Sequence, residues 1–319
     1  MLTLLFVGDI NLGRTAGRLL KSQSNFYPFA YVEDTIKSAD LACGNLESQI
    51  ANITLQNPPW YILIAPPEAA PVLKRAGFDY LSLANNHSWD GRATAVLQSI
   101  SYLKKYKIGF SGAGKPDPLQ PYITEVKNTT IAIFSVTAIS NWGFGKTEQK
   151  YIARATSRLF EKIKSVKSKV DLVIVSYHGD FEYKFFPTQR KIIFAKKCIE
   201  AGADIFWGHH PHYIQGEFFY KGKLIAFSLG NFVFAQKDPN AKLSYILKVY
   251  LNPNTKKIES IEHIPIKAGF TPVPLPPNSP EGKKVLRLLK EISYLKDTEL
   301  VPWYQFKKSQ FSNSAIKEK

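Results

Sequence analysis

Residues that bind metal ions recur at one kind of position in this sequence, directly after short apolar runs. Three imidazoles stand within four residues, at His209, His210 and His212, and a packing role does not explain such crowding. The other candidate ligands follow further apolar runs; they are Asp9, Asn11, Glu47, Asn86 and His178. Imidazole favours zinc, iron, nickel or copper, whereas carboxylate and amide oxygens favour manganese and magnesium. The mixed set therefore predicts a divalent-metal site.

Such a donor set can hold two ions roughly 3.5–4 Å apart, which clamp both ends of an in-line displacement at phosphorus. The ions also lower the pKa of a bridging water and so produce a nucleophile near neutral pH. The sequence contains no Gly-x-Ser-x-Gly elbow, P-loop or Gly-x-Gly-x-x-Gly turn that would indicate another chemistry. We expect a dinuclear centre of manganese, zinc or iron that acts on an anionic substrate.

Three more polar residues near these runs can act on a substrate. His87 follows Asn86 directly, and neighbouring side chains at a strand end point to opposite sides, so only one of them is expected to face the metals. We expect the shorter amide of Asn86 to be the ligand and His87, oriented by Asp90, to protonate the leaving group. The alternative is that His87 only braces its loop through Asp90. Arg14 can bind an anionic oxygen through its planar guanidinium or form a structural salt bridge.

Taken singly, these residues also have structural explanations. Asp9 can cap a following helix, and Glu47 can be a solvated loop carboxylate. Asn86 suits a turn, and His178 can be a buried, hydrogen-bonded imidazole. The set as a whole is more informative, because five of the six histidines, all except His263, follow apolar runs. Histidines scattered through a core would not show this pattern.

The elements that must position these residues indicate an α/β protein, because short apolar runs alternate with segments of helical periodicity. The expected strands cover 4–7, 41–43, 80–84, 131–136, 172–175, 205–207, 224–227, 245–251 and 258–266. The expected helices cover about 29–38, 67–76, 92–106, 150–168 and 188–201. The carboxyl ends of parallel strands share one edge of a sheet, where α/β folds place their ligand sites. This edge would gather the candidate ligands.

The composition changes after about residue 268. Five prolines between 272 and 280 predict an extended linker, and residues 281–296 predict a terminal helix. The polar tail beyond about 305 is expected to fray. We therefore expect one domain over 1–268, with a Pro-rich linker and a C-terminal helix over 269–319 that pack on it.

The charge and the cysteines limit the partners and the class of fold. The chain has 42 Lys and Arg against 26 Asp and Glu, which gives a formal net charge of +16. This charge favours an anionic substrate, polymer or surface, but no nucleic-acid-binding module accompanies it, so no specific nucleic-acid binding is expected. The two cysteines, Cys43 and Cys198, form no motif. They exclude a disulfide framework and a zinc ribbon, and two unpaired core thiols are expected.

Six motifs, found in order over about residues 3–235, resemble the CapA family, the poly-γ-glutamate capsule synthesis proteins also called PgsA-like. The motifs are Gly8-Asp9-Ile10-Asn11-Leu12-Gly13-Arg14, Asn45-Leu46-Glu47, Ala84-Asn85-Asn86-His87-x-x-Asp90, His178-Gly179-x-x-Glu182-Tyr183, Gly208-His209-His210-Pro211-His212 and Ser228-Leu229-Gly230-Asn231-Phe232. The CapA family is in turn similar to calcineurin-like metallophosphoesterases. The resemblance implies a metallophosphoesterase-like four-layer αββα sandwich, in which two mixed β-sheets are flanked by helices around a dinuclear metal centre.

The resemblance also implies roles for single residues. It makes Asp9 and Glu47 metal ligands, Asn86 the bridging-site amide and His87 the general acid. The remaining implied ligands are His178, His210 and His212. Asn11 stands where the superfamily has a histidine, and Asn45-Leu46-Glu47 departs from the usual Gly-Asp-x-x-Asp, so one metal position is in question. His209 is an additional imidazole, and which two of the three clustered histidines coordinate stays open.

The resemblance leaves two functions. The first is a metal-dependent hydrolase in which a metal-activated water attacks a phosphoester or a related bond. The alternative is a non-catalytic, metal-containing accessory protein in the assembly or export of an anionic polymer such as poly-γ-glutamate. The sequence as it stands shows neither a signal peptide nor an apolar span, which predicts a soluble, cytoplasmic protein. The family implies in addition a cell-surface location and peripheral association with a membrane or a capsule-synthesis complex.

Overall fold

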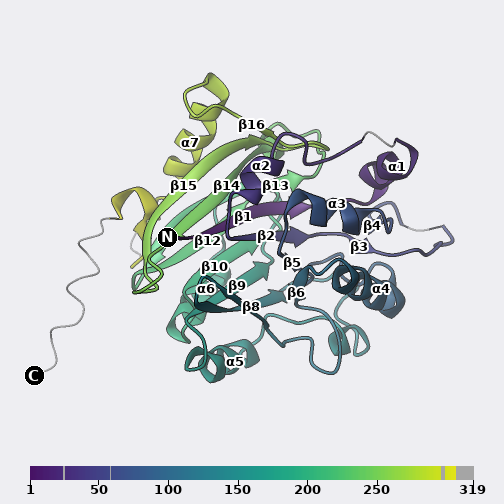
Figure 1. Cartoon of the computed structure of the whole chain (residues 1–319), viewed down its shortest axis with the longest axis horizontal. Helices are drawn as coiled ribbons and strands as arrows, with labels where there is room; N and C mark the ends of the chain where they lie inside the picture. The colour runs from purple at the N-terminus through teal and green to yellow at the C-terminus, as the bar shows by residue number, and fades with distance from the viewer. Residues whose placement is uncertain (24–25, 58, 296–298, 307–319) are drawn as a thin grey trace, which may run out of the picture.

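Two mixed β-sheets pack face to face in this protein, with helices on their outer faces (Figure 1). The computed structural model describes residues 1–23, 26–57, 59–295 and 299–306. The predicted fold class, an α/β sandwich of two mixed sheets flanked by helices, is confirmed. None of the described helices combines the length and apolarity needed to cross a membrane.

The first sheet contains eight strands in the order β16-β15-β14-β1-β2-β5-β6, with β13 paired to β1. Their bounds are β1 Leu2–Ile10, β2 Leu41–Leu46, β5 Tyr80–Ser82, β6 Gly109–Ser111, β13 Asn231–Val233, β14 Leu243–Leu251, β15 Ile258–Lys267 and β16 Val273–Pro274. Strands β1, β2, β5 and β6 run parallel, whereas β14 and β15 are antiparallel to their neighbours. The carboxyl ends of β1, β2 and β5 therefore lie at one edge of this sheet.

The second sheet contains seven strands in the order β17-β11-β12-β10-β9-β8-β7. Their bounds are β7 Tyr122–Val126, β8 Thr129–Thr137, β9 Leu172–His178, β10 Ile205–His209, β11 Ile214–Tyr220, β12 Lys223–Leu229 and β17 Val301–Pro302. Strands β8, β9, β10 and β12 are parallel. A separate two-stranded pair joins β3 (Gln49–Ile50) to β4 (Ile64–Ala65).

The helices cover both outer faces, and three apolar clusters join the layers. The helix bounds are α1 Arg14–Ser22, α2 Glu33–Lys37, α3 Ala69–Ala76, α4 Arg92–Lys105, α5 Arg158–Lys167, α6 Gln189–Glu200 and α7 Pro280–Ile292. The first cluster packs α2, α3 and α4 on one sheet, the third packs α5 and α6 on the other, and the second fills the space between the sheets. Cys43 and Cys198 are buried and free, as predicted.

Most predicted elements are present, but the helix expected over 150–168 is wrong in its first half. Helix α5 begins only at Arg158. Upstream of it, Ile152 forms an antiparallel bridge with Ala113, and Arg154 forms a parallel bridge with Thr137. Ile152 is therefore buried by strand-like pairing, which the three- and four-residue spacing of apolar residues could not reveal.

The C-terminal part of the chain packs on both sheets. Helix α7 is capped by the Ser279 side chain, which accepts a hydrogen bond from the Gly282 N–H, and Pro280 occupies its first turn. Its buried face, with Val285 and Leu289, belongs to the cluster between the sheets. The tail that we expected to fray falls mostly on 307–319, outside the described residues.

Glycine at position 8 lets β1 approach β13 closely. A Cβ atom built on Gly8 would lie 1.9 Å from the carbonyl oxygen of Gly230, which also accepts the N–H of Asp9 at 3.0 Å. Any larger side chain would push the two backbones apart and so displace Asp9. The close approach therefore positions the carboxylate that follows it.

Gly8→Ala should lower the free energy of unfolding by about 1–3 kcal/mol, because overpacking forces backbone shifts of this cost. Urea unfolding followed by circular dichroism measures the change. Gly145→Ala is the matched control, since an added Cβ there meets no atom within 4 Å. Equal midpoints for the two variants would contradict the proposed constraint.

Candidate metal centre

The register of the parallel strands brings the predicted ligands to one edge of the sandwich. In the first sheet Asp9 of β1 pairs with Asn45 of β2, and in the second sheet His209 of β10 pairs with His178 of β9. Asp9, Glu47 and Asn86 therefore come from the first sheet or the loops after it. His178 and the cluster at 209–212 come from the second sheet, so the site bridges the two sheets.

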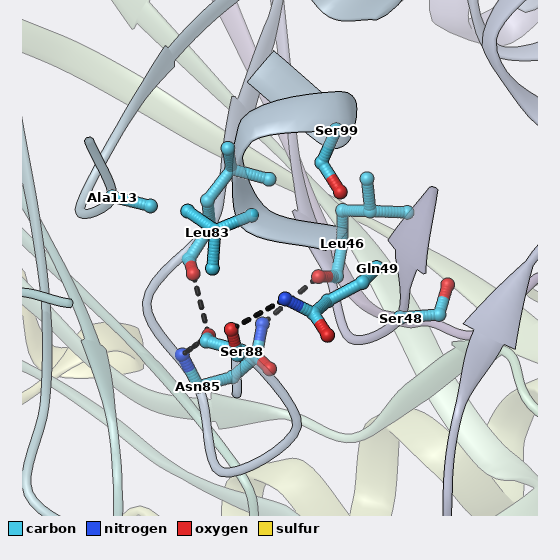
Figure 2. Close-up of a pocket in the computed structure, with 9 residues that line it drawn as sticks. Leu46, Ser48, Gln49, Leu83, Asn85, Ser88, Ser99 and Ala113 are labelled. Atoms are coloured by element: carbon cyan, nitrogen blue, oxygen red, sulfur yellow. Dashed lines mark hydrogen bonds between the residues drawn. The ribbon is translucent and has the colours of Figure 1, made fainter. Parts of the chain in front are cut away.

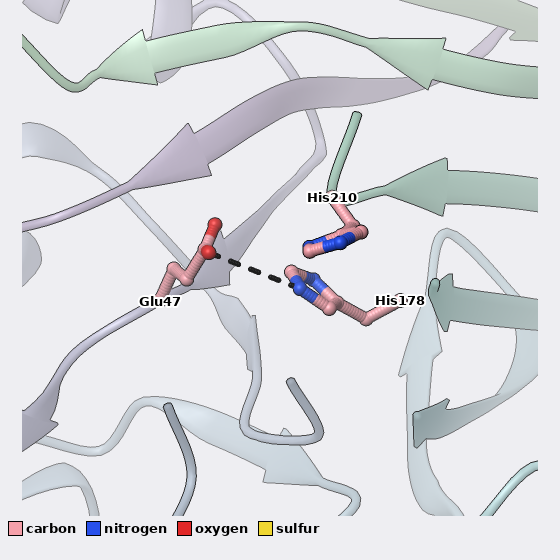
Figure 3. A group of neighbouring side chains, drawn as sticks. All are labelled: Glu47, His178 and His210. Carbon is pink, nitrogen blue, oxygen red and sulfur yellow. Dashed lines mark ion pairs between the residues drawn. The ribbon is translucent and has the colours of Figure 1, made fainter. Parts of the chain in front are cut away.

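Two overlapping groups of buried side chains can each hold a metal ion. Glu47, His178 and His210 form one, and Asp9, Glu47 and His212 form the other, with the donor atoms of each group all within 4.8 Å of one another. Figure 3 shows the first group, in which the Glu47 carboxylate points toward the two imidazole rings. The distance from Glu47 Oε1 to His178 Nε2 is 3.8 Å. Glu47 belongs to both groups, so it is a candidate ligand in either one.

Several buried polar atoms of the cluster lack hydrogen-bond partners among the described residues, and this favours cation binding. Glu47 is fully buried, and neither of its carboxylate oxygens has a hydrogen-bond partner among the described residues. The same holds for Asp9 Oδ2 and for Nδ1 of His210. Burying an ionised group without partners is very costly, and native proteins rarely do so without a reason. A divalent cation would satisfy all these atoms, so the residues present fit the predicted metal.

Two asparagines orient the ligands of the second group. Asn45 Nδ2 donates to Asp9 Oδ1 at 2.9 Å, which leaves Asp9 Oδ2 free toward Glu47 and His212. Asn231 Nδ2 donates to the carbonyl of Ala241, so its Oδ1 faces His212 Nδ1 at 2.8 Å. Such partners commonly fix the tautomer and direction of metal-binding imidazoles.

The electrostatics of the cluster also favour a cation. Burial raises the pKa of Glu47 well above its usual value, and the nearby Asp9 carboxylate raises it further. Burial would also raise the pKa of Asp9, but hydrogen bonds and charges from the neighbouring histidines outweigh it and hold that pKa well below its usual value. Burial lowers the pKa values of His178 and His210, which keeps both imidazoles neutral at pH 7. Neutral imidazole is the form that binds metal.

The loop after β5 presents Asn86 to this cluster. Asn86 Oδ1 lies 2.9 Å from His178 Nε2, and Asn86 Nδ2 donates to Asn141 Oδ1 at 3.2 Å, which directs the amide oxygen toward the cluster. Figure 2 shows how the loop is held: Ser88 Oγ accepts from the Asn85 N–H at 2.7 Å, and Asn85 Nδ2 donates to the carbonyl of Leu46 at 2.8 Å. The void beside these bonds measures only about 10 Å³, so the loop is packed rather than open to a ligand.

His87 stands beside the cluster with its ring held by Asp90. The His87 Nδ1 to Asp90 Oδ2 distance is 2.8 Å, and His87 Nε2 lies 4.0 Å from Glu47 Oε1. Asp90 is itself held by the Leu63 N–H at 2.7 Å and by Trp142 Nε1 at 3.1 Å. With Nδ1 directed to Asp90, the other ring nitrogen faces the metal-binding residues.

Asn11 and His209 make contacts outside the two metal-binding groups, and Arg14 lies exposed near the cluster. Asn11 Oδ1 accepts the Gly13 N–H at 2.8 Å, so this oxygen serves the turn before α1. His209 is buried with Nδ1 3.2 Å from Asp9 Oδ1, but it belongs to neither metal-binding group. Arg14 is exposed and forms no ion pair with any described residue, so the structure shows no partner for the salt bridge considered as the alternative.

A cleft of about 380 Å³ opens above the cluster. Its lining residues are Arg14, Trp60, Tyr61, Leu63, His87, Glu182, Tyr183, His212, Phe234, Ala235, Gln236, Lys237 and Asp238. Sequence reasoning did not identify Asn45 and Asn231 as site residues, although both stand inside the motifs. It also missed Asn141 and Trp142, for which the sequence carries no signal, because their partners lie more than 50 positions away.

The sequence and the fold are similar to those of known proteins. Residues 3–236 match the family of the bacterial capsule synthesis protein PGA_cap. The PGA biosynthesis protein CapA of Bacillus subtilis is 30% identical over 300 residues, which covers 92% of this chain and 79% of that protein. The capsule biosynthesis protein CapA of Bacillus anthracis is 29% identical over 313 residues, which covers 92% of this chain and 74% of that protein.

Two solved structures share the fold at low sequence identity. A structure described as a novel phosphatase from Mycoplasma pneumoniae has a TM-score of 0.53 and 16% identity, covering 83% of this chain and 93% of that one. A hypothetical protein from Thermus thermophilus has a TM-score of 0.53 and 14% identity, covering 83% of this chain and 98% of that one. The likeness shows that this chain shares its fold with these two proteins.

Glu47→Gln should reduce the bound metal substantially and stabilise the metal-free protein. An amide costs less to bury without partners than a carboxylate does, so in EDTA the variant should melt at a higher temperature than the wild type. Added manganese should raise the melting temperature of the wild type more than that of the variant, because binding stabilises only the state that binds. Elemental analysis and thermal unfolding measure the two effects.

Glu148→Gln is the matched control for this change. Glu148 is also buried with one unpartnered oxygen, but it hydrogen-bonds Ser140 and belongs to neither metal-binding group. It should retain wild-type metal content. Equal metal loss in both variants would argue against Glu47 as a ligand.

Proposed function

This chain belongs to the PGA_cap family of bacterial capsule synthesis proteins, and we propose that it is a metal-dependent hydrolase that cleaves a phosphoester or a related bond. The observation that carries the proposal is the fully buried Glu47 carboxylate, unpartnered within the described residues and shared by two groups of metal-binding side chains. A buried carboxylate in a purely structural role normally has at least one hydrogen-bond donor. Glu47 has none among the described residues.

We propose that Asp9, Glu47, His178, His210 and His212 hold the metal, with the Asn86 amide oxygen beside them. A pair of divalent ions in such a site supplies Lewis acidity and lowers the pKa of a bound water. The protein contributes a rigid set of donors from two sheets and excludes bulk water from the base of the cleft. Rigid placement of this kind supplies much of the catalytic effect in hydrolytic sites.

His87 is proposed to be the general acid. Asp90 holds Nδ1 at 2.8 Å, which directs Nε2 toward Glu47 and the cleft. His87 lines the cleft and can donate its Nε2 proton to the oxygen of the leaving alcohol. Trp142 and the backbone of Leu63 keep Asp90 in place, so the acid is positioned before substrate binds.

Arg14 is proposed to bind an anionic oxygen of the substrate at the mouth of the cleft. Its guanidinium is exposed and lacks an ion-pair partner among the described residues, so it is free to form one with a phosphate. The backbone of Arg14 adopts φ 51°, a left-handed conformation that costs energy for a residue with a side chain. Strain of this kind is concentrated at functional positions.

Hydrolysis of bis(p-nitrophenyl) phosphate and p-nitrophenyl phosphate by manganese- or zinc-loaded protein tests the proposal. His178→Ala should abolish the activity. An inactive wild type with full metal content would refute it and favour the accessory function, in which the metal is structural. The names of the relatives, PGA and capsule biosynthesis proteins, and the net charge of +16 support that second function, which polyglutamate binding without hydrolysis would show.

His87→Ala should keep its metal and lose activity mainly on esters with poor leaving groups. A positioned general acid contributes about 10²–10⁴-fold, and this contribution is needed least when the leaving group is already a good one. Alkyl phosphates should therefore slow by this factor, whereas nitrophenyl esters should slow much less. Steady-state kinetics on both substrate types and elemental analysis give the result.

Trp142→Phe provides a graded second variant. It removes the hydrogen bond to Asp90 but keeps an aromatic ring beneath the Arg92 guanidinium, which lies 3.5 Å from the ring centroid. Trp142→Phe should also slow hydrolysis of alkyl phosphates more than that of nitrophenyl esters, but by a smaller factor than His87→Ala. Loss of metal from His87→Ala, or an equal loss on both types of ester, would show that His87 is not the acid.

A further inference from the structure

Four aromatic side chains line the cleft above the metal-binding residues. Trp60 and Tyr61 come from the segment between β3 and β4, whereas Tyr183 follows β9 and Phe234 follows β13. The Phe234 ring centroid lies 4.8 Å from that of His212, and the Tyr183 centroid lies 5.9 Å from it. A group bound between these aromatic residues would therefore be next to the metal centre.

Two of these aromatic residues present uncovered surface. Trp60 is 80% exposed and Tyr183 is 44% exposed. Tyr183 is nevertheless fixed, because its N–H donates to the Pro211 carbonyl at 2.8 Å and its backbone holds φ 57°. A strained backbone conformation next to a binding site is typical of functional positions. Exposed aromatic rings at the mouth of a site of this volume are suited to stacking on a flat apolar surface of a ligand.

The charged side chains around the cleft indicate which part of a ligand can be charged. Arg14 lies 6.0 Å from the Trp60 ring centroid and has no carboxylate partner among the described residues. Glu182 and Asp238 also line the cleft, together with Lys237. The two carboxylates would repel a continuous polyanion, but they can accept hydrogen bonds from hydroxyl groups. The lining therefore fits a ligand with one anionic end and a neutral, hydroxyl-bearing part.

We infer, building on the proposed hydrolase function, that the substrate is a phosphate ester of a ring-bearing alcohol, either a nucleoside or a sugar. The phosphate lies between the metal-binding residues and Arg14, and the ring stacks on Trp60 and Tyr183. Hydrolysis adds the oxygen of water to phosphorus and breaks the bond to the alcohol oxygen. That oxygen takes the proton of His87 Nε2, and the products are phosphate and the free alcohol. The attacking water releases one proton to solvent, and His87 regains its Nε2 proton from solvent.

Matched phosphate monoesters with aliphatic leaving groups test the inference. Glycerol 3-phosphate has no ring, glucose 6-phosphate has a saturated ring, and adenosine 5′-monophosphate has a nucleobase. At least one ring-bearing ester should have a kcat/KM roughly five- to tenfold above that of glycerol 3-phosphate, as expected for one aromatic contact. The ester that shows the gain distinguishes a sugar from a nucleoside. Equal values for all three would overturn the inference.

Trp60→Ala should remove this preference by raising KM for the ring-bearing ester roughly five- to tenfold. Tyr31→Ala is the matched control, because Tyr31 is 65% exposed and does not line the cleft. An unchanged preference in Trp60→Ala, or the same loss in both variants, would refute the role of Trp60. The KM effect distinguishes contact with the ring from a general loss of structure, which thermal unfolding of each variant would show.

Binding separates this inference from the proposed reaction. Titration of the metal-loaded protein with adenosine 5′-monophosphate or glucose 6-phosphate should change the tryptophan fluorescence, and glycerol 3-phosphate should bind at least about fivefold more weakly. Ring-selective binding without turnover of any ester would refute the hydrolase and support the ligand class. Turnover without ring selectivity would support the hydrolase and refute the ligand class. A fluorescence change with phosphatidylglycerol vesicles but not with either ring-bearing phosphate would show a membrane contact and overturn the inference.

Discussion

The buried carboxylate of Glu47 is the constraint on which the rest of the site depends. At 0% exposure, without hydrogen-bond donors among the described residues and with its pKa raised by burial, this carboxyl group is costly to keep ionised unless a cation accompanies it. The protein maintains it by surrounding it with donors that are already oriented. Asn45 holds Asp9, Asn231 holds His212 and Asn141 holds the Asn86 amide, so the donor atoms point inward before an ion arrives. Partners of this kind fix the orientation of metal-binding side chains.

The site lies where the carboxyl ends of parallel strands meet. Its position also depends on the left-handed backbone conformations that follow β10. His210 and His212 adopt φ values of 96° and 57° immediately after β10, which turns their side chains back toward β1 and β2. For non-glycine residues such conformations cost roughly 1–3 kcal/mol each. The close contact of Gly8 with Gly230 and that of Gly208 with the Phe227 carbonyl bring neighbouring backbones together beneath the same residues.

The sequence predicted the sheets and the members of the cluster because both leave local signals. Asp9, Glu47 and His178 each follow an apolar run, and parallel strands convert that position into proximity. Asn141 and Trp142 leave no such signal, since their role arises from a loop that folds over a distant one. The bridges of Ile152 and Arg154 were also missed, because the spacing of apolar residues indicates burial but not the segment with which a residue pairs. Strand β11 went unnoticed because Gln215 and Glu217, both fully buried, interrupt its apolar pattern.

The same geometry couples metal binding to the integrity of the sandwich. Asp9, Glu47 and Asn86 belong to the first sheet and its loops, whereas His178, His210 and His212 belong to the second. At this edge polar side chains of the two sheets contact each other, as in the 3.2 Å distance from His209 Nδ1 to Asp9 Oδ1 and the 2.9 Å distance from His178 Nε2 to Asn86 Oδ1. Burial and the neighbouring Asp9 carboxylate both raise the pKa of Glu47, so keeping Glu47 ionised next to Asp9 is unfavourable without a cation. A cation bound by these residues would contact side chains from both sheets, so metal binding is expected to stabilise this edge of the fold.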